Sequence, residues 1–171
     1  MIWRVFKRAP GVSAASAAWW RTAAAAEREP QGNALNDLRA ALAGADADPD
    51  ERERQVEMLE GLEQLAAIAA RDLDVIQTQH RVIGTDVCHF VAPACLVGLT
   101  DEPGKLFLTS RRLIHVCAKV RTWPWHRLGG VERAERALEI TILGAPDTIN
   151  VTCNTYGDAM AAAHLVRRLQ R

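Results

Sequence analysis

The residues best suited to chemistry are a set of cysteines and histidines, Cys88, His89, Cys95, His115, Cys117 and His126, and the chain has one further cysteine, Cys153. Zinc takes four such ligands in tetrahedral geometry, usually from closely spaced pairs. No Cys-x-x-Cys pair occurs here, and the side chains fall on both faces of the expected strands. We interpret the cysteines as reduced core thiols of a cytosolic protein, because free cysteine is among the most buried residue types. The alternative is a metal- or thiol-dependent enzyme that uses this Cys/His set.

No other motif indicates catalysis. The sequence contains no glycine loop that could cradle a phosphate, no HExxH and no GxSxG. Asp46, Asp48, Asp50 and Glu57 match positions 1, 3, 5 and 12 of a calcium loop, but Glu51 stands where the turn requires glycine. Stabilisation of a helix N-terminus by acidic side chains explains the same residues. We therefore predict no enzyme activity, no cofactor and no metal site.

Basic side chains concentrate in one stretch of an otherwise neutral chain. The chain has 21 basic and 21 acidic residues, but its 103–136 stretch holds Lys105, Arg111, Arg112, Lys119, Arg121, Arg127, Arg133 and Arg136 against only Glu132 and Glu135. Arginine and tryptophan are typical of the centres of interfaces. The predicted partner-binding residues are Arg111, Arg112, Lys119, Arg121, Trp123, Trp125 and Arg127.

Some of these assignments have a purely structural alternative. Thr109-Ser110-Arg111-Arg112 is also typical of a hairpin turn, in which Thr and Ser bond the backbone and the arginines stay solvated. Within Trp123-Pro124-Trp125, one tryptophan would then seal the strands against the N-terminal helices. Both interpretations stay open at the level of the sequence.

The N-terminal segment, 1–32, is cationic and amphipathic. Its first 26 residues contain four basic side chains and no acidic one, and apolar residues recur at helical spacing from Ile2. Three roles are open: a helix that docks its Trp and Ala face on the fold, a membrane-interface segment, or a targeting peptide. The membrane-interface candidates are Trp3, Arg4, Phe6, Lys7 and Arg8.

A helical hairpin is predicted over 33–77. Asp48, Pro49 and Glu51 form the capping-box-like start of its second helix. That helix carries one apolar seam over 49–77, made of Leu59, Leu62, Ala66, Ala69, Leu73 and Ile76. Because the apolar stripe is wider than a two-stranded seam, we expect it to be buried against more than one neighbour. Pairing of two copies of the chain through this helix is an alternative.

Beyond Thr78 the sequence changes to short β-rich runs separated by turn residues. Strands are predicted at 86–91, 94–98, 105–109, 113–118, 120–125, 131–134, 137–143 and 148–153. Gly129-Gly130 is interpreted as one of the turns. A helix over 159–169 follows and is able to cover one open end of the strands. The pattern predicts an antiparallel meander that curls into a barrel or sandwich.

The series GKLFLTSRRLIHV, then VRTWPWHRLGGVERA, then LEITI, a last strand and a terminal helix resembles GRAM and bacterial PH-like domains. The resemblance covers about 78–171 and implies a small, bent antiparallel barrel closed by one C-terminal helix. The predicted fold class is therefore α+β, with a cationic segment (1–32), a helical hairpin (33–77) and a PH-like domain (78–171). Domains of this superfamily bind lipid head groups, peptides or proteins and lack catalytic residues.

The resemblance implies a noncatalytic binding or scaffolding module. Its partner would be a protein or an anionic membrane surface, near which each basic side chain contributes about 1 kcal/mol. Asp101 and Glu102 stand where lipid-binding PH domains concentrate basic residues, which favours a protein partner or the chain's own acidic 46–63 segment. Neutral total charge disfavours nucleic acid. No apolar run is long enough to span a membrane, so we expect a cytoplasmic protein, with peripheral membrane association as the alternative.

Overall fold

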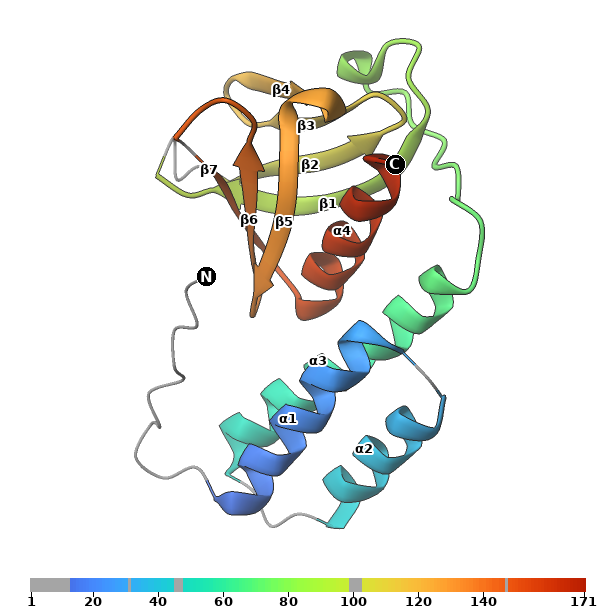
Figure 1. The fold of residues 1–171 in the computed structure, drawn as a ribbon, viewed down its shortest axis with the longest axis vertical. Coiled ribbons are helices and arrows are strands. Elements are labelled where there is room, and N and C mark those ends of the chain that lie inside the picture. Colours follow the sequence, from blue (N-terminus) through green and yellow to red (C-terminus); the bar gives the residue numbers. More distant parts are fainter. Residues whose placement is uncertain (1–12, 31, 45–47, 99–102, 147) are drawn as a thin grey trace.

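The fold has three tiers, which the computed structural model describes over 13–30, 32–44, 48–98, 103–146 and 148–171. Seven strands form one tier, helix α4 lies beside them, and helices α1 to α3 cover the other side of α4 (Figure 1). The helices are α1 (Ala14–Arg28), α2 (Gly32–Gly44), α3 (Pro49–Ala69) and α4 (Tyr156–Leu169), with two 3-10 turns, η1 (Arg81–Ile83) and η2 (Trp125–Arg127). The strands are β1 (Cys88–Leu96), β2 (Pro103–Thr109), β3 (Arg112–Val116), β4 (Val120–Pro124), β5 (Leu128–Ala134), β6 (Ala137–Ile142) and β7 (Thr148–Cys153). The predicted α+β class is confirmed.

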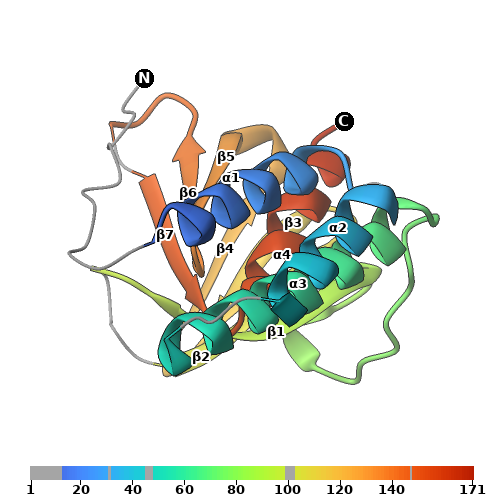
Figure 2. The same ribbon diagram turned by 90° about the horizontal axis from the view of Figure 1, so that it is seen from below.

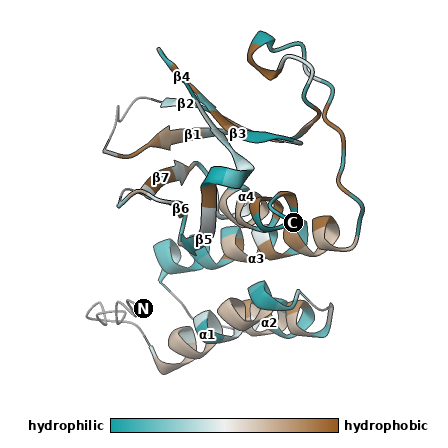
Figure 3. Ribbon diagram, turned by 45° about the horizontal axis from the view of Figure 1, so that its top comes forward, coloured by the Kyte–Doolittle hydropathy of each residue, from teal (hydrophilic) through white to brown (hydrophobic). Residues whose placement is uncertain are grey.

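The N-terminal helices form a layer of their own around a shared apolar cluster. Helix α1 contributes Trp19 and Ala23 to this cluster, where they meet Leu38 of α2 and Leu62 of α3. The indole N–H of Trp19 donates to the Leu38 carbonyl at 3.0 Å, so the one polar group of this buried ring is satisfied. Hydrophobic and hydrophilic bands alternate along α2 and α3, as expected of amphipathic helices (Figure 3). Docking is therefore the role of the described part of the N-terminal segment.

Helix α3 begins where the sequence predicts but ends earlier. The Asp48 side chain accepts from the Asp50 N–H at 3.1 Å and Pro49 occupies the first turn, as expected of this cap. The helix ends at Ala69, so the predicted span of 49–77 is too long. Ile76 keeps the helical spacing but lies in an extended segment, where its N–H donates to the Cys88 carbonyl at 2.8 Å. Periodicity alone could not reveal that this residue packs on the sheet instead of along the helix.

All seven strands are antiparallel, in the order β4-β3-β2-β1-β7-β6-β5. The predicted strands 86–91 and 94–98 are one strand, β1, with Pro93 inside it. β7 pairs with β1 only over Ala94–Leu96, so one side of β1 has no strand neighbour at Pro93. A proline that lacks the N–H donor is tolerated at such a place. This is why the proline does not divide the strand.

The predicted turn at Gly129-Gly130 is instead a bulge inside β5. The pairing of β5 with β6 skips from Leu128 to Val131, which leaves the two glycines as the irregular part of the strand. The change of direction occurs just before them, in η2. Its first residue, Trp125, donates its backbone N–H to the Arg111 carbonyl at 3.2 Å and so joins η2 to the β2–β3 turn.

The sheet is open, in contrast to the closed barrel implied by the resemblance. β4 and β5 are its two edges, and no pairing joins them in the described part of the chain. On the β5 edge the Val131 carbonyl accepts from the Arg167 side chain at 3.1 Å, and the Gly129 carbonyl accepts from Gln170 at 2.6 Å. The last turn of α4 therefore satisfies this edge, where a closed barrel would use another strand.

Helix α4 joins the two halves of the molecule because it is apolar on opposite faces. Its Leu165 and Val166 lie in the core of the sheet, whereas its Met160 lies in the cluster of the N-terminal helices. Two glycines permit close contact between α3 and α4: a Cβ on Gly61 would stand 2.9 Å from the Gly157 nitrogen. Viewed from below, α1 to α3 extend across α4 (Figure 2). Leu59 and Leu62 of the predicted apolar seam are thus covered by helices of the same chain, as the width of the stripe predicts, whereas Ala69 is exposed and Leu73 and Ile76 lie beyond the end of α3.

Candidate functional site

The turn between β2 and β3 holds its arginines by a network centred on Thr109. The Thr109 hydroxyl accepts from the backbone N–H groups of Arg111 and Arg112 at 3.3 and 3.1 Å, so the hairpin interpretation of this stretch is correct. The Arg112 guanidinium donates to the Asp86 carboxylate at 2.8 Å. The Asp86 side chain is only 4% exposed and that of Arg112 is 34% exposed, which makes this a partly desolvated ion pair. Arg112 thus binds an acid of its own chain and fastens the segment before β1 to the hairpin.

Arg111, Lys119 and Arg127 remain available to solvent, and we call these three side chains the basic face. The Arg111 side chain is 73% exposed and 3.7 Å from Asp86, which Arg112 already holds more closely. Lys119 and Arg127 are exposed and have no ion pair among the described residues. Arg111 precedes β3 and Lys119 follows the turn after it, so a five-residue strand, about 17 Å long, separates them. Arg111 and Lys119 therefore lie at opposite ends of β3, and Arg127 lies beyond β4, in η2.

The other three predicted contact residues are drawn into the protein. Trp125 is 8% exposed, and its indole N–H donates to the Thr109 carbonyl at 2.8 Å. Trp123 is half-buried against the same core, opposite Leu113 of β3. Arg121 is half-buried opposite His115, and its Nε atom has no hydrogen-bond partner in the described structure. Arg121 and Trp123 thus lie on the inner side of β4, and Trp125 packs into the core from η2.

Two arginines of the same basic stretch bind the helical layer. Arg133 of β5 forms a bidentate pair with Glu27 of α1, with one contact at 2.6 Å. Arg136, in the β5–β6 turn, pairs with Glu57 of α3 and stacks over the Tyr156 ring at 5.4 Å from its centroid. The expected attraction between the basic stretch and the acidic 46–63 segment therefore exists inside the molecule. It runs through Arg136 and not through the residues chosen from the sequence.

The four cysteines lie in different surroundings. Among the described residues, no group of three or more His, Cys, Asp or Glu side chains has the proximity to hold a metal ion. Burial and the charge of Asp158 raise the pKa of the Cys153 thiol to about 12, and burial raises the pKa of Cys88. Both thiols thus stay protonated and are poor nucleophiles at neutral pH. Cys95 and Cys117 are half-buried. The expectation that all four cysteines are core thiols therefore holds only for Cys88 and Cys153.

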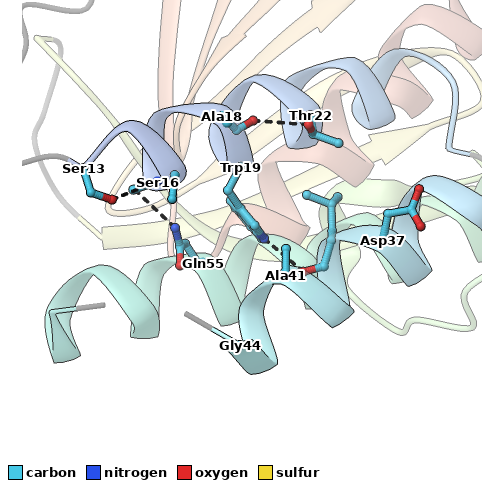
Figure 4. A pocket seen from close by; sticks show the side chains of 11 residues that line it. Ser13, Ser16, Ala18, Trp19, Thr22, Asp37, Ala41, Gly44 and Gln55 are labelled. Carbon is cyan, nitrogen blue, oxygen red and sulfur yellow. Dashed lines mark hydrogen bonds between the residues drawn. The ribbon is translucent and has the colours of Figure 1, made fainter. Parts of the chain in front are cut away.

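A concave region lies between α1 and α2, away from the basic face. It is a groove of about 580 Å³ whose lining includes Trp19, Leu38 and Ala41 (Figure 4). At its end the Gln55 side chain donates to the Ser16 hydroxyl at 3.3 Å, and Ser16 in turn donates to Glu51 at 2.5 Å. None of the residues predicted from the sequence to bind a partner lies in its lining.

The membrane-interface candidates Trp3, Arg4, Phe6, Lys7 and Arg8 lie outside the described residues, as do Asp101 and Glu102. A search of the helices in the described part of the chain finds none with the length and apolarity of a transmembrane span. Sequence reasoning also missed two acids, Asp86 and Glu27, whereas Glu57 lies in the acidic 46–63 segment that the sequence offered as a partner. No local pattern marks Asp86 and Glu27, because their arginine partners are distant in the sequence.

Comparison with known proteins identifies no family for this chain. No family model matches the sequence, and no curated protein matches it. Among solved structures, the C-terminal domain of an unknown protein from Leishmania infantum is 17% identical over 53% of this chain and 91% of that chain, with a TM-score of 0.45. The DH/PH fragment of PDZRHOGEF in complex with human RhoA gives 12% identity over 91% of this chain and 52% of that chain, with a TM-score of 0.45. The complex of the FERM and C-terminal domains of Drosophila Merlin gives 12% over 92% and 60%, with a TM-score of 0.35.

The chain thus spans about half the length of the DH/PH chain it is similar to. With TM-scores below 0.5, these similarities say nothing about the function of this chain.

Proposed function

We propose that the chain is a noncatalytic binding or scaffolding module, of the PH-like kind that the GRAM resemblance implies, and that its basic face recruits an acidic segment of a partner protein. The observation that carries the proposal is the exposure of three cations in the β3–β4 hairpin and in η2, which follows it. Lys119 and Arg127 have no ion pair among the described residues, and the nearest acid to Arg111 is already held by Arg112. These cations contribute little to the stability of the fold, and their arrangement suits the binding of a partner.

An acidic protein segment fits this surface better than a single head group. The span of about 17 Å between the ends of β3 suits an extended ligand with several carboxylates. Val120, which follows Lys119, is 51% exposed and offers apolar contact beside the charge. In addition, the acids Asp101 and Glu102 in the sequence before Pro103 would repel phosphate. Complementary charge of this kind chiefly sets the association rate and the choice of partner.

The test is a fluorescence anisotropy titration with a set of labelled peptides that alternate Glu and Leu, compared with vesicles that contain phosphatidylserine. The face variant carries Arg111→Gln, Lys119→Gln and Arg127→Gln. The matched control carries Arg21→Gln, Arg52→Gln and Arg71→Gln, three exposed arginines of the helical half and the segment that follows it. We expect the peptides to bind the wild type and the control, and the face variant to bind at least about tenfold more weakly.

Two outcomes contradict the proposal. Equal peptide binding by the face variant and the control would mean that the basic face is not the contact surface. Binding to phosphatidylserine vesicles without peptide binding would replace the protein partner by a membrane. The noncatalytic part has its own test, elemental analysis of the purified protein, in which stoichiometric zinc or iron would favour the alternative enzyme built on the Cys/His set.

A further inference from the structure

A cleft on the other side of the molecule has features that the proposed binding function does not use. It lies where α1, the β5–β6 turn and α4 meet, and its volume is about 780 Å³. This is within the range of small-molecule sites. Its lining residues include Glu27 and Arg28 from α1, Arg133 and Glu135 from the hairpin, and His164 and Arg167 from α4.

The polar groups of this cleft fall into two sets. Arg133 already has partners in the chain, because Glu27 neutralises it and the Glu135 carbonyl also accepts from it. Arg167 is positioned by only one contact, from one terminal nitrogen to the Val131 carbonyl at 3.1 Å, and its guanidinium has other donors. Arg28 has no ion pair in the described part of the chain. The cleft therefore combines an exposed arginine that a backbone contact orients with an exposed arginine that has no ion pair in the described part of the chain.

His164 is the unpartnered group in this cleft. His164 is one of the lining residues, and its Nε2 atom is buried and has no hydrogen-bond partner in the described structure. Burial and the neighbouring charges of Arg168, Arg167 and Arg171 lower its pKa, so the ring is neutral at pH 7. A buried ring nitrogen without a partner is an unmet interaction that a ligand can supply. An anion placed there would also relieve the mutual repulsion of the arginines on the last turns of α4.

We propose that this cleft binds a small molecule with a phosphate or carboxylate group, held by Arg28, Arg167 and His164. The guanidinium of arginine is suited to both groups, because its planar array of donors matches two oxygens at once. Arg28 is at the C-terminal end of α1, on the helical layer, and Arg167 is on α4. A bound anion would thus link the helical layer to the domain that contains the sheet, beside the ion pair of Arg133 with Glu27.

The experiment uses the full chain and follows the imidazole signals by NMR over a pH titration. His164→Gln identifies the His164 signal among those of the five histidines. The probes are inorganic phosphate and citrate, each compared with sodium chloride at the same ionic strength. An anion bound beside the ring favours its charged form, so the pKa of His164 rises with the probe and not with chloride. Comparison of phosphate with citrate shows which of the two groups the cleft prefers.

The decisive comparison is between two arginines of the same helix. Arg28→Gln removes a cation of the cleft, and we expect phosphate or citrate to bind about tenfold more weakly, as is typical of a lost charge-assisted hydrogen bond. Arg21→Gln removes the same charge from an exposed position outside the lining and should leave binding unchanged. The proposal is wrong if neither probe moves the His164 signal beyond the effect of chloride, or if both variants respond equally. Either result is independent of whether the basic face binds acidic peptides.

Discussion

The arginines of the β5–β6 hairpin and those of the β2–β4 region come from the same basic stretch of sequence but have different surroundings. Arg133 is 9% exposed and paired with Glu27, and Arg136 is paired with Glu57, so both bind the sheet domain to the helical layer. Arg111, by contrast, is 73% exposed, and Arg127 has no ion pair among the described residues. The difference between the two groups lies in the acids that the fold brings near them. Charge density in a sequence thus does not separate internal ion pairs from a binding surface.

The comparison also orders the expected effects of substitution. Internal pairs form in partly buried surroundings, where the removal of one partner leaves a charge without solvent or counterion. Solvated cations lose little in stability when they are removed, because exposed pairs contribute only about 0 to 1 kcal/mol. Stability should therefore respond to changes in the first group, and binding should respond to changes in the second.

The largest effect is expected from a change that separates the helical layer from α4. Gly61→Leu would place a side chain where even a Cβ is 2.9 Å from the Gly157 nitrogen, which is backbone and cannot move aside easily. We expect a loss of about 3 kcal/mol or more in the free energy of unfolding, measured by guanidinium denaturation. Gly44→Leu is the matched control, because a Cβ at that position meets no atom within 4 Å. A variant of Gly61 as stable as the control would mean that the close contact between α3 and α4 is not essential.

The second effect concerns Asp86, which pairs closely with Arg112 and only distantly with Arg111 in the β2–β3 turn. Asp86→Asn should cost about 2 kcal/mol of stability, because Arg112 loses its carboxylate partner in a partly buried setting. Asp72→Asn, an exposed acid of the segment that follows α3, is the control and should have almost no effect. Urea denaturation measures both. An equal response of the two variants would show that the Arg112 pair does not stabilise the turn.

The third prediction compares the two groups of arginines directly. Arg133→Gln should lower the free energy of unfolding by about 1.5 kcal/mol, because Glu27 loses a bidentate partner. Arg127→Gln should change it by less than about 0.5 kcal/mol, as is usual for an exposed position. Thermal unfolding under identical conditions gives the difference. If Arg127→Gln proved as costly as Arg133→Gln, the division between internal and solvent-facing cations would fail.

Much of the fold could be predicted because its signals are local. The start of α3 follows from Asp48 and Pro49, whose cap forms as predicted. The end of α3 could not be predicted, since Leu73 and Ile76 keep helical spacing while they pack against two different apolar clusters. In the same way Pro93 indicates a break between two strands, and only the short pairing with β7 explains why β1 continues through it.

The candidate site was less predictable because its partners are remote. Arg112 and Asp86 are 26 residues apart, and the acids that pair with Arg136 and Arg133 are 79 and 106 residues away. Local sequence identifies the cations but contains no record of these contacts. Trp125 shows a related limit: alternation placed it on a strand, whereas it begins a 3-10 turn that carries its ring into the core.

The smallest effect depends on pH. It concerns the carboxylate of Glu51, inside the helical layer. Burial raises its pKa, but hydrogen bonds from Ser16 and Trp20 and the charge of Arg54 outweigh burial, so the pKa lies below its ordinary value of 4.5. A carboxyl group whose pKa is lower in the folded state contributes stability above pH 4.5 and loses it as the pH falls toward the folded-state value. The wild type should therefore lose more stability on acidification than Glu51→Gln.

The difference should be below about 1 kcal/mol, because the pair with Arg54 is partly solvated. It is measured as the urea midpoint of wild type and variant from pH 6 to about pH 3, a range that includes the ordinary carboxyl pKa. Glu60→Gln removes an exposed acid of the same helix and should leave the pH profile of the wild type unchanged. Parallel profiles for all three proteins would mean that Glu51 is solvated like the cations of the basic face. Its contacts with α1 would then contribute nothing to the attachment of that helix.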